Sequence, residues 1–144
     1  MRAIVACALG LLLAANGLTM LANPAAWYGA VPGVSDTGPL NEHFVRDIGT
    51  AYLVAGTAFA AFALSSKVWP AALSAAAFVS LHAVVHLWDA AAGREHAHRL
   101  LIDIPTVFVP PPAALWLVWQ PRPRGANSRK ENDHDQMVSA ALDQ

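Results

Sequence analysis

Four long apolar windows divide the chain, and none of them contains Asp, Glu, Lys or Arg. They cover residues 3–35, 48–66, 68–88 and 104–121. A membrane-spanning helix needs about 20 mostly apolar residues, so each window is long enough to contain one or most of one. The pattern predicts helices near residues 3–22, 45–65, 69–89 and 100–119.

The segment 23–43, which begins in the first window and continues past its end, is rich in Pro and Gly and is predicted to be a loop. The first helix has two interpretations. One Arg, an apolar run and small residues are typical of a cleaved signal peptide. Small residues in this helix also suit close helix packing in a bilayer, which is the interpretation we prefer. The residues that suit such packing are Gly10, Ala14, Ala15 and Gly17.

Composition agrees with a membrane protein. Hydrophobic residues make up 56% of the 144 residues and charged residues only 13%, whereas soluble domains are about one-quarter charged. The formal net charge of -1 and the lack of a basic face predict no nucleic-acid partner. The expected fold class is all-α, an integral membrane four-helix bundle surrounded by the lipid bilayer.

Prolines interrupt the fourth predicted helix. Pro110, Pro111 and Pro112 lie inside its window, and Pro105 lies just before them. Proline lacks a backbone N–H and clashes with the preceding turn of a helix. The sequence therefore predicts that the fourth helix is kinked at the triple proline.

The distribution of Lys and Arg predicts the orientation. With both termini in the cytoplasm, six basic residues lie inside and three outside. The inner set is Arg2, Lys67, Arg122, Arg124, Arg129 and Lys130, and the outer set is Arg46, Arg94 and Arg99. Residues 1–121 are then the transmembrane domain. Residues 122–144 are polar and are expected to form a disordered cytoplasmic tail.

With this topology, most of the polar side chains of the predicted spans fall in the outer leaflet. Three helices contribute, and ionisable groups at that depth usually face the bundle interior or a wet cavity. The candidate metal ligands are His43, Asp47, His82, His86, Asp89 and Asp103. His82, His86 and Asp89 share one helical face because they are spaced at i, i+4 and i+7.

Several kinds of chemistry remain open for this cluster. Imidazole and carboxylate ligands suit Zn, Fe or Cu(II). A haem b would need two His on facing helices, for instance His43 and His86. A His–Asp pair can also exchange a proton with a quinone, since imidazole titrates near neutrality. The structural alternative is that His82, His86 and Asp89 only form hydrogen bonds between helices.

Two further roles are expected at the helix ends. Arg46 is predicted to form a structural ion pair with Asp89 or Asp103, or with its neighbour Asp47. Asn41 can cap the second long helix, with Glu42 favourably placed in its first turn. Asp103 can likewise cap a fourth helix that begins near Pro105.

The order of these features resembles that of the small DoxX-like integral membrane proteins. The resemblance covers about residues 1–120. It rests on four short helices, a Gly/Pro-rich first loop, the string NEHFVRDIGTAYLVAG and a His-bearing third helix. It implies a four-helix bundle and, in part of that group, association with quinone-linked redox enzymes. The triple proline departs from the pattern.

Two functional hypotheses follow. The first is a small subunit of the bacterial inner membrane, associated with a redox partner, that carries out metal- or quinone-linked proton chemistry at the polar cluster. The second is a structural or accessory membrane protein whose cluster only holds helices together. A homo-oligomer is compatible with either hypothesis.

Overall fold

Helices form almost all of the described part of the chain. The computed structural model describes residues 1–94 and 97–119. Four helices are long and apolar enough to cross a membrane, namely Arg2–Ala22, Glu42–Leu64, Ser66–Ala91 and Leu100–Val118. The prediction of an all-α chain with four such helices is confirmed. The tail predicted for residues 122–144 lies outside the described residues.

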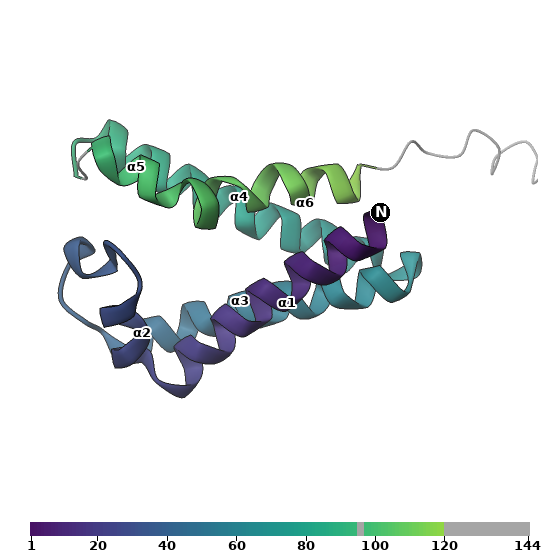
Figure 1. Ribbon diagram of the computed structural model, residues 1–144, viewed down its shortest axis with the longest axis horizontal. Coiled ribbons are helices and arrows are strands. Elements are labelled where there is room, and N and C mark those ends of the chain that lie inside the picture. Colours follow the sequence, from purple (N-terminus) through teal and green to yellow (C-terminus); the bar gives the residue numbers. More distant parts are fainter. Residues whose placement is uncertain (95–96, 120–144) are drawn as a thin grey trace, which may run out of the picture.

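The spans pack in two layers (Figure 1). One layer contains α1 and α3, and the other contains α4 with α5, η3 and α6. The layers lie closest at the end that holds the N-terminus and diverge toward α2 and α5. The elements, in chain order, are α1 (Arg2–Ala22), α2 (Pro24–Ala30), η1 (Val34–Thr37), α3 (Glu42–Leu64), η2 (Ser66–Val68), α4 (Trp69–Ala91), α5 (Ala97–Asp103), η3 (Ile104–Phe108) and α6 (Pro110–Val118).

Glycines bring α1 and α3 into backbone contact. Gly10 and Gly17 on α1 meet Gly56 and Gly49 on α3, and on each helix the two glycines are seven residues apart. A Cβ added to Gly10 would lie 2.6 Å from the Ala60 nitrogen, and one added to Gly17 would lie 2.6 Å from the Gly49 oxygen. Small residues permit this approach, as is common between helices in a bilayer. The packing predicted for Gly10 and Gly17 is therefore confirmed.

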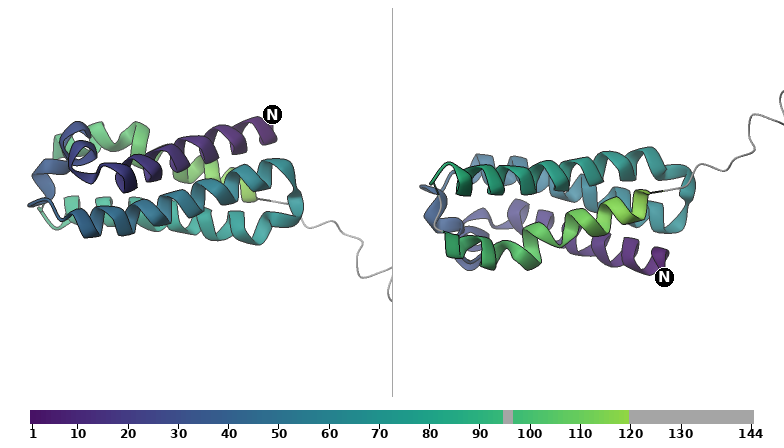
Figure 2. Two further views of the ribbon diagram at one scale, coloured as in Figure 1. Left: turned by 90° about the horizontal axis from the view of Figure 1, so that it is seen from below. Right: turned by 90° about the horizontal axis from the view of Figure 1, so that it is seen from above.

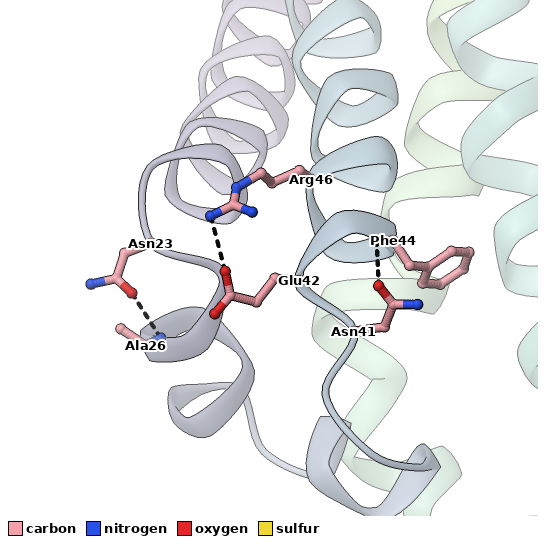
Figure 3. A network of polar contacts seen from close by, with 6 residues as sticks. All are labelled: Asn23, Ala26, Asn41, Glu42, Phe44 and Arg46. Atoms are coloured by element: carbon pink, nitrogen blue, oxygen red, sulfur yellow. Dashed lines mark hydrogen bonds and ion pairs between the residues drawn. The ribbon is translucent and has the colours of Figure 1, made fainter.

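Asparagine side chains cap two of the helices (Figure 3). Asn41 Oδ1 accepts a hydrogen bond from the Phe44 N–H at 3.1 Å, and Asn23 Oδ1 accepts one from the Ala26 N–H at 3.0 Å. Each cap satisfies a donor that the first turn of a helix leaves free. The predicted cap at Asn41 is confirmed, and it makes α3 begin at Glu42, earlier than residue 45.

The hydrogen-bond pattern changes in the middle of the fourth span. After α5, the five residues of η3 are π-helical, and the Val109 N–H donates to the Ile104 carbonyl at 2.9 Å. The backbone of Val109 stays in the helical region, with φ −76° and ψ −40°. Helix α6 then begins at Pro110, so the three prolines occupy its first turn, where a missing N–H costs least.

Helix α1 begins and helix α6 ends at the same end of the bundle (Figure 2), and tryptophans join the spans there. The Trp69 indole N–H donates to the Val118 carbonyl at 2.8 Å, which ties α4 to α6. The Arg2 guanidinium donates to the Trp119 carbonyl at 3.4 Å and lies 5.3 Å from the centre of the Trp116 ring. Residue 1 and residue 119 therefore lie at the same end of the bundle.

Candidate functional site

A buried His–Asp pair links α4 to the fourth span. His86 Nδ1 and Asp103 Oδ2 are 2.8 Å apart, and their side chains are 18% and 7% exposed. A carboxylate can only accept hydrogen bonds, so with Asp103 ionised the imidazole donates through Nδ1. Asp103 is the only buried polar or charged residue in the described part of the chain.

Aromatic side chains extend this pair toward the middle of the bundle. His82 lies one helical turn from His86, and their ring centroids are 4.9 Å apart. The Tyr52 ring from α3 packs edge-on against His82 at 5.6 Å and against Phe78 at 5.3 Å. Phe78, His82 and His86 follow one another at intervals of four residues, so α4 presents them on a single face.

Tyr52 contacts His82 in the site, although the sequence pattern did not predict it as a site residue. It is the only tyrosine within the four predicted spans, and a buried tyrosine hydroxyl usually finds a hydrogen-bond partner. Its partners could not be identified from the sequence because they come from α4, whose rotation against α3 is set by packing.

Arg46 does not pair with any of the three aspartates expected. Its guanidinium instead binds the Glu42 carboxylate at 3.0 Å, one turn earlier on α3 (Figure 3). Asp89 pairs with Arg94 at 2.7 Å, just beyond the end of α4. The predicted ion pair of Arg46 with Asp89 or Asp103 is therefore wrong. Both carboxylates have nearer partners, and Arg46 binds one within its own helix.

Asp103 does not cap a helix either. Helix α5 begins at Ala97, before the predicted start near Pro105, and Asp103 is its last residue. No side-chain capping bond forms there. The Asp103 carboxylate turns toward α4 and accepts a hydrogen bond from His86. This hydrogen bond is charge-assisted when Asp103 is ionised.

The six candidate metal ligands lie in three separate places. His86 and Asp103 form the buried pair with His82 beside it, whereas Asp89 binds Arg94. His43 and Asp47 pair at 3.4 Å on the surface of α3, with side chains 86% and 60% exposed. Among residues 1–94 and 97–119, no group of three or more His, Cys, Asp or Glu side chains is arranged to hold a metal ion.

The arrangement brings together groups that are able to hold and exchange a proton. A hydrogen bond of 2.8 Å joins the His86 imidazole to the buried Asp103 carboxylate, and the His82 imidazole lies in ring contact with His86. Imidazole exchanges protons at both nitrogens near neutral pH. His43 and His86 are not placed to bind the two faces of one haem, since His43 lies on the exposed surface of α3 and His86 is largely buried.

Comparison of this chain with protein-family models, with curated proteins and with solved structures found no match in any of the three. The fold therefore defines the described part of the protein only as all-helical, with four helices apolar enough to be transmembrane.

Proposed function

We propose that the chain is a small multi-pass protein of the bacterial inner membrane in which His86 and Asp103 exchange protons for a membrane redox partner. The observation that carries the proposal is the 2.8 Å contact between these two side chains inside the spans. Ionisable groups at such depth are costly, so they usually mark function. The resemblance to DoxX-like proteins supports this proposal, because it implies association with quinone-linked redox enzymes in part of that group.

Membrane insertion is supported by the outward surface of every span. Each helix exposes large aliphatic side chains that water would not favour but lipid would accept. Examples, with their exposed fractions, are Leu12 (70%), Val54 (69%), Leu81 (66%) and Leu101 (69%). The fourth span bends at the triple proline in this proposal, because the prolines remove the bonds that would keep it straight.

The proposed chemistry divides the work between this chain and its partner. Reduction of a quinone to a quinol takes up two protons and two electrons. The electrons come from the redox partner, and the His86–Asp103 pair relays protons from the aqueous face to the quinone oxygen. Proton exchange is favoured over metal ligation because, among the described residues, no three His, Cys, Asp or Glu side chains converge on one point where they could hold a metal ion.

Infrared difference spectroscopy of the purified protein tests this function. A short-chain benzoquinone is added and reduced with dithionite, and the carboxyl region is recorded before and after. We expect a protonation change of one carboxyl group that Asp103→Asn removes and the exposed control Asp47→Asn retains. An unchanged carboxyl region, together with a His86→Ala variant that only melts earlier, would support the structural alternative instead.

Bound cofactors are tested on the same sample. Metal analysis and an absorption spectrum of the detergent-purified protein distinguish the remaining chemistries. About one metal per chain, or a Soret band, that is lost in His86→Ala and kept in His43→Ala would replace proton exchange with metal or haem chemistry.

The proposed orientation places both termini in the cytoplasm. Its support comes from the basic residues of the segment 122–130, because the described part of the chain has two basic residues at one end and three at the other. These are Arg2 and Lys67 at the first end, and Arg46, Arg94 and Arg99 at the second. A reporter enzyme fused after Gln144 is expected to be active in the cytoplasm and inactive in the periplasm. Periplasmic activity would invert the orientation and place the His86–Asp103 pair on the cytoplasmic side.

A further inference from the structure

The Val107 carbonyl has no hydrogen-bond donor in its own helix. A donor would have to come from the residue three, four or five positions later, and those residues are Pro110, Pro111 and Pro112. None of them has a backbone N–H. Val107 is only 8% exposed, so the carbonyl belongs to a buried residue. A buried carbonyl that is left without a hydrogen bond destabilises the fold.

Two contacts give the register between α4 and the fourth span. His86 meets Asp103 toward one end, and Trp69 meets the Val118 carbonyl toward the other. The helices run antiparallel, so the residue four positions after Asp103 lies level with the residue four positions before His86. Val107 is therefore level with His82. Val107 shares a helical face with Asp103, and His82 shares one with His86.

The other polar groups at this level also lack partners. Within residues 1–94 and 97–119, neither the Tyr52 hydroxyl nor either ring nitrogen of His82 makes a hydrogen bond. Tyr52 and His82 supply two donors and also accept, whereas the carbonyl only accepts. Tyr52 and His82 are in ring contact, and the Val107 carbonyl lies at their level in an apolar bundle. Leaving three such groups without hydrogen bonds is costly.

We propose that Tyr52, His82 and the Val107 carbonyl bind a hydroxyl group in the middle of the bundle. The hydroxyl donates to the Val107 carbonyl and accepts from the Tyr52 hydroxyl or the His82 N–H. Two molecules supply this chemistry, a water molecule and the phenolic hydroxyl of a quinol. The inference stands on these three groups and not on proton exchange at the His86–Asp103 pair, so either can fail alone.

The sequence offers a direct probe of this site. Val107–Phe108 is the only Val–Phe pair in the chain. Labelling valine carbonyl carbons with ¹³C and phenylalanine nitrogens with ¹⁵N therefore gives one HNCO signal, that of the Val107 carbonyl. The spectrum is recorded on full-length protein in detergent, without additive and then with a short-chain benzoquinol. Its dimethyl ether, which lacks the hydroxyl, is the ligand control.

Two proline variants calibrate the signal. Pro111→Ala restores an N–H four residues after Val107. The Val107 carbonyl resonance of this variant should therefore take the hydrogen-bonded, downfield position and stop responding to the quinol. Pro112→Ala is the matched control. The next N–H, that of Ala113, donates to the Val109 carbonyl four residues earlier, and in the same pattern the new N–H at position 112 donates to the Phe108 carbonyl. We expect Pro112→Ala to respond like the wild type.

Each outcome decides the proposal. A downfield wild-type resonance without additive, moved upfield by Tyr52→Phe, identifies water as the ligand. A downfield shift that saturates with the quinol, is absent with the dimethyl ether and is weakened by Tyr52→Phe identifies the quinol hydroxyl. A Val107 resonance that Tyr52→Phe does not move, with or without the quinol, overturns the proposal.

Discussion

Replacing Gly56 with leucine is expected to separate α1 from α3 and to lower the free energy of unfolding by about 3 kcal/mol. A Cβ at Gly56 would lie 2.6 Å from the Gly10 oxygen and 2.8 Å from the Ala14 Cα. Both are backbone atoms, so no side-chain rotation can make room. The whole helix has to move, and the neighbouring contact at Gly49 and Gly17 is lost with it.

Thermal or denaturant unfolding in detergent measures this effect. Gly29→Leu is the matched control, because an added Cβ at Gly29 meets nothing within 4 Å and the residue lies in a helix. Gly56→Ala should fall between the wild type and Gly56→Leu. Equal stability of Gly56→Leu and Gly29→Leu would show that the glycine contact does not hold the two helices together.

Removal of one member of the His86–Asp103 pair is expected to have a similarly large effect. His86→Ala leaves the Asp103 carboxylate buried without its partner, which typically costs about 3–5 kcal/mol. Replacing both residues with alanine should cost less than the sum of the single changes, because no buried charge is then left unpaired. The side chains are only 18% and 7% exposed, so water cannot replace the lost contact.

The surface pair on α3 provides the control for this cycle. His43 and Asp47 have the same residue types at 3.4 Å, but their side chains are 86% and 60% exposed. Exposed ion pairs contribute about 0–1 kcal/mol, so His43→Ala should leave the unfolding curve almost unchanged. Equal effects of His86→Ala and His43→Ala would mean that burial gives the His86–Asp103 pair no special weight.

The sequence predicted the residues that form the site better than it predicted their pairings. His86 and Asp103 were both candidates, and the structure places them in direct contact. Arg46 was expected to bind an aspartate of another helix, yet Glu42 lies one turn away on α3 and is reached without any interhelical alignment. Tyr52 was missed because its role depends on its contact with His82, which no single helix contains.

The sequence by itself determined the properties that depend on neighbours along the chain. Four uncharged windows specify four apolar helices, since hydropathy and length are local. Three successive prolines remove every main-chain donor of the same helix that could reach the Val107 carbonyl. Only the tertiary structure decided which helices meet and at what rotation. The Gly10–Gly56 and Gly17–Gly49 contacts align α1 with α3. The packing of the fourth span against α4 brings Asp103 to His86. That rotation depends on the side chains of several helices at once, so no single window encodes it.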